Sequence, residues 1–268
     1  MKTTAITPAL GVEVSGDVDL ENPEVVGRLT EALKWRGVLL FRGLNLDDDG
    51  QLEFSRKLGR LVQPAPGQEI FTVSLDPAKS PSAEYLKGTF SWHIDDTTND
   101  VPAKPPCSPA ATSRRSAAAP SSPTPTPPSR TSPRPSASAT RDCASSTASK
   151  PPSAPSTPTP TDEQVARWRQ LPTHESSLVW DRRDGRRSLV IGATADHIVG
   201  MEPDESRALI DELQAWATQE RFCYAHDWEV GDMVVWDNTG MLHRALPYDP
   251  SSERLMRRVT IVGDEAWQ

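Results

Sequence analysis

The sequence is poor in the residues that build disulfide-stabilised or membrane-spanning proteins. It has only three cysteines, scattered without the spacing of a disulfide framework or a zinc knuckle: Cys107, Cys143 and Cys223. No apolar run approaches the ~20 residues of a membrane span, and the first ten residues lack the apolar core of a secretory leader. A Gly-rich phosphate loop and an internal repeat are also missing. These absences predict a cytoplasmic protein.

Positive charge is also in short supply. The chain carries 29 Lys and Arg against 37 Asp and Glu, a formal net charge of −8. An excess of negative charge opposes binding to nucleic-acid phosphates and to anionic membranes, so neither is expected as a partner. The 268 residues fit a single domain spanning 1–268. Length and charge leave the oligomeric state open, a homo-oligomer included.

One window of the chain lacks every large apolar residue. Residues 105–160 contain no Leu, Ile, Val, Met or aromatic residue, but hold 15 of the 26 prolines together with many Ser, Ala and Thr. Such a composition cannot bury a core, so the window is predicted to be a disordered, low-complexity segment inside the domain.

The sequence on both sides of this window is typical of a globular protein. Helices are predicted from a 3.6-residue apolar period at 23–36, 47–58 and 203–217, and each of the first two is followed by a glycine that ends it. Short strands are predicted from apolar or alternating runs at 37–44, 70–75, 89–95, 177–181, 188–193, 222–228, 231–238 and 255–263. Many short strands with few helices favour a mainly β fold, a sandwich or jelly roll with flanking helices.

A candidate metal site begins with His93 and Asp95. Residues two apart on a strand point to the same face, so this imidazole and carboxylate can converge on one ion. His243, just after the apolar run MVVW, is the best candidate for a third ligand. Two His and one carboxylate are typical of non-haem Fe(II) oxygenases. An isolated H-x-D also fits a strand histidine that only hydrogen-bonds its neighbour.

Two arginines follow at a suggestive spacing. Arg254 lies eleven residues beyond His243 and Arg258 four further on, so both share one face of a predicted strand. A guanidinium binds a carboxylate through two parallel hydrogen bonds and stays charged when buried. The alternative, a solvated basic edge that discourages sheet aggregation, is preferred for Arg257 only.

With these residues in place, the chain resembles the Fe(II)/2-oxoglutarate dioxygenases of the taurine dioxygenase group. The matching stretches are GVLLFRGL, SWHID, VGDMVVWDN and LHRALPYDPSSERLMRRVTIVGD. The resemblance implies a double-stranded β-helix, interrupted here by the Pro/Ser/Ala/Thr-rich window. It implies Fe(II) as cofactor, 2-oxoglutarate and O2 as cosubstrates, and three iron ligands: His93, Asp95 and His243.

The same resemblance assigns further residues. It implies that Arg254 binds the distal carboxylate of 2-oxoglutarate, that Arg258 meets an anionic group of the substrate, and that Thr89 lines the substrate pocket. The implied reaction hydroxylates a small, anionic organic substrate, either a taurine- or alkylsulfonate-like compound or a carboxylate. Succinate and CO2 are its coproducts.

Two other functions stay open at this point. The first is a catalytically inactive or merely metal-binding jelly-roll protein, because 105–160 replaces core. In the family a threonine 27 residues past the first metal histidine helps hold 2-oxoglutarate, and Pro120 stands there in this chain. The second is an interaction protein whose proline-rich window binds peptide-recognition domains. The window has no regularly repeated PxxP motif, which disfavours it.

The window is interpreted as a frameshift running from near Lys104 to near Thr161. Codons of Pro, Ser, Thr and Ala can all carry C at the second base. In a GC-rich gene the third bases of codons are mostly G or C, and a shift of the reading frame turns third bases into second bases. Such a shift therefore yields these residues. Regrouping the codons of 118–128 permits a strand-like sequence with Thr where Pro120 stands. A natural Pro/Ser/Thr linker is the alternative. However, the spacing on both sides already fits the family, so nothing has been inserted.

The nucleotide sequence tests the frameshift. Compared with related genes, we expect compensating insertions or deletions at the two ends of codons 105–160, and their absence contradicts the interpretation. Residues 105–160 carry too few apolar side chains for burial to compensate for the conformational entropy lost when the segment becomes ordered. We therefore also expect the chain with this sequence to be poorly folded or inactive, and a frame-corrected chain to be active. Robust succinate production by the purified, uncorrected chain would contradict that second expectation.

Overall fold

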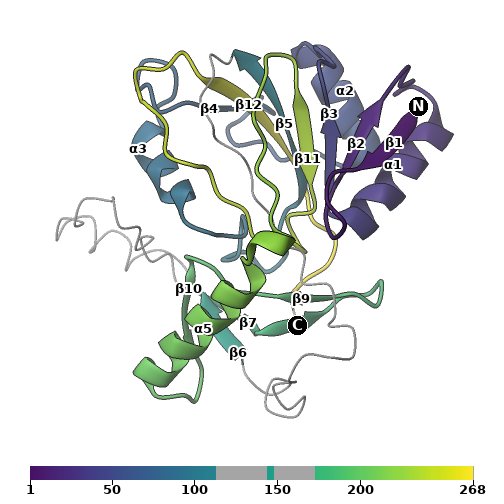
Figure 1. Cartoon of the computed structure of the whole chain (residues 1–268). Helices are drawn as coiled ribbons and strands as arrows, with labels where there is room; N and C mark the ends of the chain where they lie inside the picture. Colours follow the sequence, from purple (N-terminus) through teal and green to yellow (C-terminus); the bar gives the residue numbers. More distant parts are fainter. Residues whose placement is uncertain (113–143, 148–172, 268) are drawn as a thin grey trace.

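The computed structural model describes residues 1–112, 144–147 and 173–267 (Figure 1). Seven of the described strands form one sheet, in the order β1-β2-β3-β11-β5-β12-β4. Neighbours in it are antiparallel except for the parallel pair β2 and β3. The bounds are β1 Lys2–Ala5, β2 Val12–Ser15, β3 Val38–Phe41, β4 Phe71–Val73, β5 Lys104–Thr112, β11 Met233–Trp236 and β12 Leu255–Ile261.

A smaller group of strands lies on the other side of the molecule, next to a long helix (Figure 1). Three described strands pair in the order β10-β6-β7, and β8 forms a hairpin with β9. The bounds are β6 Ala144–Thr147, β7 His174–Ser177, β8 Val179–Asp181, β9 Arg187–Leu189 and β10 Ala195–Ile198. The helices are α1 Pro23–Arg36, α2 Asp48–Leu58, α3 Ala83–Leu86 and α5 Pro203–Ala217, with 3-10 turns η1 Lys87–Phe90 and η2 Glu220–Phe222.

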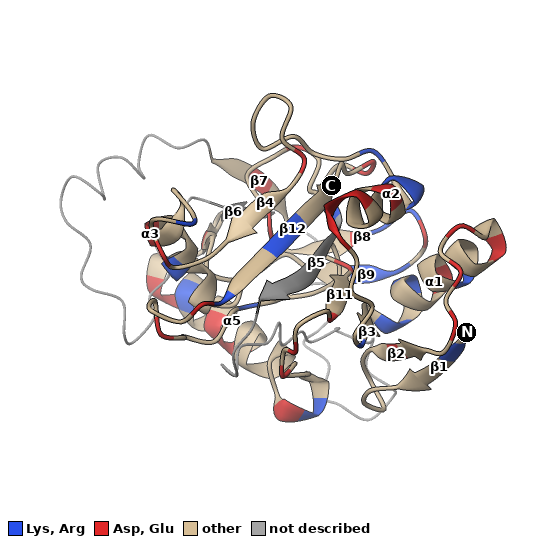
Figure 2. Ribbon diagram, turned by 90° about the horizontal axis from the view of Figure 1, so that it is seen from above, with Lys and Arg blue, Asp and Glu red and all other residues tan. Residues whose placement is uncertain are grey.

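The ends of α1 follow from its sequence. The Asn22 side chain accepts a hydrogen bond from the Glu24 amide at 2.9 Å, and Pro23 occupies the first turn, where its missing N–H costs nothing. Gly37 ends the helix in the left-handed conformation and donates to the Leu33 carbonyl. Both α1 and α2 carry acidic residues in the first turn and basic residues in the last, which complements the helix dipole (Figure 2). The predicted helices are confirmed.

The main sheet is packed on both faces, as the alternation along β11 shows. Met233 and Val235 belong to a buried cluster with α1 and α2, whereas Val234 and Trp236 belong to a second cluster on the opposite face. A third cluster joins β8, β10 and α5, and includes Ile94 and Leu242, which flank the candidate metal ligands in the sequence. The functional segments therefore lie between two apolar cores.

Two predicted strands are absent from the structure. The run 89–95 begins in η1 and makes a single isolated bridge, at His93, and the run 222–228 follows η2 without strand pairing among the described residues. Alternating or apolar residues can equally be buried from a loop, so the pattern alone could not distinguish the two. The hairpin predicted around the turn RRDGRR is confirmed as β8 and β9.

The proline-rich window is described in two stretches. Its start forms β5, between β11 and β12 in the main sheet, and residues 144–147 form β6. The expectation of a structureless window does not hold at these two stretches, although Pro105, Pro106 and Pro109 of β5 have no backbone N–H to donate to a neighbouring strand. The remainder, including Pro120, lies outside the described residues, so its disorder stays a prediction. In the part of the chain that is described, no helix is both long and apolar enough to cross a membrane.

A buried polar network closes the loop before β11. His226 is 1% exposed, its Nε2 lies 3.0 Å from an Asp232 carboxylate oxygen, and its Nδ1 lies 2.7 Å from the Tyr224 hydroxyl. Arg42, just beyond β3, donates to the same carboxylate at 2.6 Å. Burial, reinforced by the positive charge of Arg42, lowers the pKa of His226 to about 4, so the imidazole is neutral near pH 7.

This network predicts a pH-dependent stability. Because the pKa of His226 is lower in the folded state than in the unfolded chain, stability is full above pH ~6.5 and falls as the pH drops toward 4, by ~3 kcal/mol in all. A His226→Gln variant should flatten this part of the profile, measured as unfolding midpoints between pH 7 and 4. The exposed His197 provides the control, since His197→Gln should leave the slope unchanged. Equal slopes in all three proteins would contradict the assignment.

Candidate metal centre

His93 and His243 come from distant parts of the chain and meet directly. Each donates its backbone N–H to the carbonyl of the other, at 3.0 and 2.9 Å, in an isolated antiparallel bridge. Directly opposite residues on paired strands place their side chains on the same face. The two imidazole rings accordingly lie 4.2 Å apart between centroids.

Asp95 completes the cluster from two residues beyond His93. One carboxylate oxygen lies 3.4 Å from His243 Nε2 and the other lies 3.8 Å from His93 Nε2. One ligand atom from each of the three residues lies within 4.8 Å of the others. The neighbours Ile94 and Leu242 are buried in the α5 core, which fixes the backbone from behind. The structure thus brings together the three ligands that the sequence predicts.

The tautomer of His93 suits metal binding. Its Nδ1 lies 2.8 Å from the Ser91 carbonyl, which can only accept, so Nδ1 carries the proton and Nε2 presents a lone pair to the cluster. Burial, together with the neighbouring His243, lowers the pKa of His93 to about 4. The imidazole is therefore neutral near pH 7, the form in which histidine ligates metals.

Asp95 is held as a carboxylate although it is buried. Burial opposes its ionisation, but the Arg258 guanidinium, whose Nη1 lies 3.0 Å from Asp95 Oδ2, and His243 hold its pKa well below the ordinary range. His243 is 5% exposed, and neither ring nitrogen has a hydrogen-bond partner among the described residues. Buried polar atoms of this kind normally have partners. Two imidazoles and a carboxylate, with buried nitrogens to satisfy, fit a divalent iron.

The two arginines differ in their surroundings. Arg254 precedes β12, is 6% exposed, and its Nε and Nη1 are buried without a hydrogen-bond partner in the described part of the chain. Its guanidinium lies 4.3 Å from the centre of the Tyr248 ring, and burial lowers its pKa. Arg258 lies within β12 and is engaged by Asp95. Arg257 faces the opposite side of the strand and pairs with Asp48 of α2.

Thr89 connects the metal centre to α3. Its hydroxyl donates to the Leu86 carbonyl at 2.7 Å, and its own carbonyl accepts from the Ala245 amide at 2.8 Å. Ala245 is two residues beyond His243, so this bond ties η1 to the segment that carries the third ligand. The Thr89 hydroxyl is therefore engaged with the helix backbone.

Two residues that the sequence analysis did not single out contact the ligand segments. Gly192 follows β9, and a Cβ there would lie 2.9 Å from the Trp92 carbonyl oxygen and 3.1 Å from His93 Cα. Asn238 follows β11 and hydrogen-bonds the backbone of Asp95 on both sides. Both residues contact the backbone of a ligand segment, and such contacts leave no pattern of residue types. The only signal in the sequence is that Gly192 lies in the apolar run SLVIGA and Asn238 follows the apolar run MVVW closely.

A strand-rich fold that presents two histidines, one carboxylate and a buried arginine defines the class of non-haem metal-dependent oxygenases. The sequence model of the taurine catabolism dioxygenase TauD, TfdA family matches residues 2–104 and 130–260. The chain belongs to this family.

Individual relatives match in different ways. An alpha-ketoglutarate-dependent 2,4-dichlorophenoxyacetate dioxygenase of Burkholderia sp. (strain RASC) is 45% identical over 96 residues, 36% of this chain and 30% of the relative. The chain thus aligns with less than a third of that protein's length. An alpha-ketoglutarate-dependent sulfate ester dioxygenase of Pseudomonas putida is 27% identical over 95% of this chain and 85% of its own.

Solved structures share the fold. AAD-2, crystallised with Mn(II) and N-oxalylglycine, superimposes with a TM-score of 0.81 and 23% identity over 100% of this chain and 99% of its own. A taurine dioxygenase from Burkholderia xenovorans gives a TM-score of 0.79 at 23% identity, covering 99% of this chain and 92% of its own. The predicted mainly β fold with flanking helices therefore holds in its general form.

Gly192 generates a prediction. Its φ is +125°, and a side chain at this position would collide with the backbone of His93, the first predicted metal ligand. Gly192→Ala should therefore weaken cobalt(II) binding about tenfold, which is the effect expected when a residue that positions a metal ligand is lost. Isothermal titration with cobalt(II) measures this. Gly200→Ala is the control, because Gly200 has a φ of +83° but open space around a Cβ, and it should cost stability only. Equal cobalt(II) affinity in both variants would contradict the contact's importance.

Proposed function

We propose that the chain is an Fe(II)- and 2-oxoglutarate-dependent dioxygenase that hydroxylates a small, anionic organic substrate and forms succinate and CO2. The observation that carries the proposal is the convergence of His93, Asp95 and His243, whose ligand atoms lie within 4.8 Å of one another. Bound iron would supply the activation of O2 that is coupled to oxidation of the keto acid. The same assignment makes a jelly roll the expected arrangement of the strands.

Arg254 is the proposed partner of 2-oxoglutarate. Its Nε and Nη1 are buried without a hydrogen-bond partner among the described residues, which is costly, and a carboxylate is the anion that fits these planar donors best. The Tyr248 ring lies against the guanidinium and restricts its orientation. Together these features would orient the keto acid beside the iron ligands.

Arg258 and Thr89 are the proposed substrate contacts. Arg258 holds Asp95 through Nη1, while its Nε is buried without a hydrogen-bond partner in the described part of the chain and could bind an anion. Relatives named for 2,4-dichlorophenoxyacetate, (S)-phenoxypropionate and sulfate esters act on compounds that carry a carboxylate or sulfate. These names support an anionic substrate and leave its skeleton open.

The alternative is a metal-binding protein without turnover. It is favoured by Pro120, which replaces the threonine that the family uses for 2-oxoglutarate. The match to the family sequence model also breaks off after residue 104, where the proposed frameshift begins, and resumes at 130. Cobalt(II) binding without iron-dependent succinate formation would establish this alternative.

Substitution of Arg254 tests the main proposal. In the frame-corrected chain, with iron, O2 and a panel of anionic substrates, Arg254→Met should raise the KM for 2-oxoglutarate ~10- to 100-fold, since a charge-assisted hydrogen-bond pair is lost, and should leave cobalt(II) affinity unchanged. Succinate formation measures turnover. Arg257→Met is the matched control and should alter neither quantity, because Arg257 pairs with Asp48 on the other face of β12. Unchanged KM in Arg254→Met would overturn the role of Arg254.

His243→Ala tests the metal centre itself. Loss of one of three ligands should abolish measurable cobalt(II) binding and all iron-dependent succinate formation, while the folded structure persists by circular dichroism. If His243→Ala retained wild-type cobalt(II) affinity, the dioxygenase proposal would fail.

A further inference from the structure

The side chain of Asn238 hydrogen-bonds the backbone of the proposed metal ligand Asp95. Its Oδ1 accepts a hydrogen bond from the Asp95 amide at 2.9 Å, and its Nδ2 donates to the Asp95 carbonyl at 3.1 Å. Nδ2 also donates to the carbonyl of Ala103 at 3.0 Å, just before β5. Asn238 is 0% exposed. One amide group thus fixes both sides of a single residue and ties that residue to the main sheet.

The backbone amide and carbonyl of Asp95 have no strand partner among the described strands. The bridge between His93 and His243 is isolated, so no described strand continues alongside Asp95 to pair with its amide and carbonyl. The next residue, Asp96, has a φ of +61°, which turns the chain out of the extended conformation. Buried backbone groups require a partner, and the Asn238 amide supplies one donor and one acceptor, as a neighbouring strand would.

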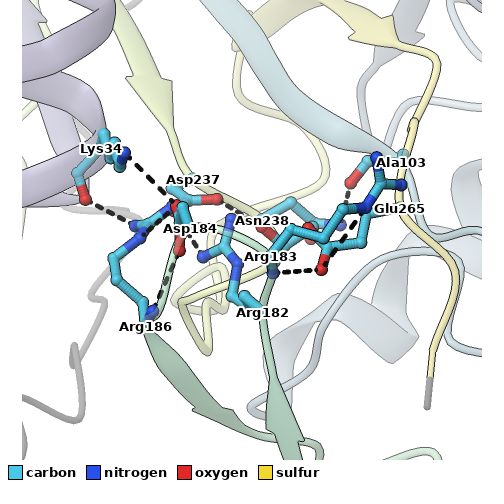
Figure 3. A network of polar contacts seen from close by, with 10 residues as sticks. Lys34, Ala103, Arg182, Arg183, Asp184, Arg186, Asp237, Asn238 and Glu265 are labelled. Carbon is cyan, nitrogen blue, oxygen red and sulfur yellow. Dashed lines mark hydrogen bonds and ion pairs between the residues drawn. The ribbon is translucent and has the colours of Figure 1, made fainter.

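The residue before Asn238 is anchored independently. The Asp237 carboxylate accepts from Arg182 at 3.1 Å and from Arg186 at 2.8 Å, both from the β8–β9 hairpin, and from the Thr239 hydroxyl at 2.6 Å (Figure 3). Its amide donates to the Gly37 carbonyl at the end of α1. Figure 3 shows Asp237 held by the arginines and Asn238 reaching toward Ala103. The backbone that carries Asn238 is therefore fixed before its side chain reaches the ligand segment.

We infer that Asn238 is a positioning residue, which sets the direction of the Asp95 carboxylate by fixing the two peptide groups on either side of its Cα. This inference rests on the proposed function, in which Asp95 is an iron ligand. Supporting residues around metal sites usually bond the ligating side chain itself. Here the support acts on the ligand's backbone, while Arg258 hydrogen-bonds the carboxylate.

The geometry requires an amide at this position. The site presents one donor, the Asp95 amide, and two acceptors, the carbonyls of Asp95 and Ala103. Aspartate has the same shape as asparagine but no donor, so it would leave both carbonyls unpaired and place negative charge against them. Asn238→Asp is therefore a test of nearly equal volume, and Asn238→Ala removes all three bonds.

The experiment titrates the metal-free full chain with cobalt(II) alone and measures unfolding midpoints in parallel. The dissociation constant should rise 10- to 100-fold in both Asn238 variants, the range expected for loss of outer-shell support. Ser206→Ala is the control, because Ser206 is equally buried and its hydroxyl accepts from the Ile198 amide at 2.6 Å, in α5 and away from the ligands. It should lower the midpoint and leave cobalt(II) affinity within twofold of the unsubstituted chain.

Each result decides the matter. Unchanged cobalt(II) affinity in a folded Asn238 variant, with a midpoint lowered as in Ser206→Ala, overturns the positioning role and leaves the dioxygenase proposal intact. No cobalt(II) binding by an unsubstituted chain that is folded by circular dichroism overturns both. If neither Asn238 variant folds, amide hydrogen exchange of the unsubstituted, metal-free chain decides. Protection of the Asp95 amide supports the inference, and exchange at the rate of an unstructured peptide overturns it.

Discussion

The metal centre depends on two backbone hydrogen bonds between His93 and His243. They bring the segment after η1 against the segment after β11, and everything that follows is built on that contact. Ile94 and Leu242 bury themselves in the α5 core on one side, while Trp236, 5.1 Å from the His243 ring, packs in the core on the other. Because alternate residues of an extended chain face opposite ways, this packing leaves the ligating side chains facing each other. The position of the site is thus set by the packing of two apolar cores, one around α5 and one around Trp236, on either side of the ligand segments.

Electrostatics then determines which chemistry the contact can support. Three potential ligands and two arginines are largely removed from water, which is costly unless the charges compensate. Arg258 keeps Asp95 ionised and burial keeps His93 neutral, and these are the protonation states in which the two groups bind a divalent metal. Both ring nitrogens of His243, and Nε and Nη1 of Arg254, still lack hydrogen-bond partners among the described residues. A metal ion and a keto-acid carboxylate would satisfy both, and this complementarity links the geometry to the proposed reaction.

Local elements of the fold follow closely from the sequence. The bounds of α1 agree with its capping residues, the start of α5 agrees with Pro203, and the buried strands β3 and β11 agree with their apolar runs, because these signals lie within a few residues of one another. The runs 89–95 and 222–228 were predicted as strands and are mostly loop, because a strand also needs a neighbour, which no local pattern specifies. Similarly, the composition of 105–160 predicts no strand, yet β5 lies between β11 and β12.

The sequence by itself singled out the candidate side chains: His93, Asp95 and His243 through residue type and spacing, and Arg254 and Arg258 through spacing together with the family resemblance. Only the tertiary structure decided how they are supported. It placed Arg257 against α2 and Arg258 against Asp95, brought Gly192 onto the backbone of His93, and directed Asn238 to the peptide groups of Asp95. The physical reason is that the ability to bind a metal or an anion depends on the chemistry of a single side chain, which the sequence shows directly. Close approach and backbone pairing between distant segments exist only once both cores have packed.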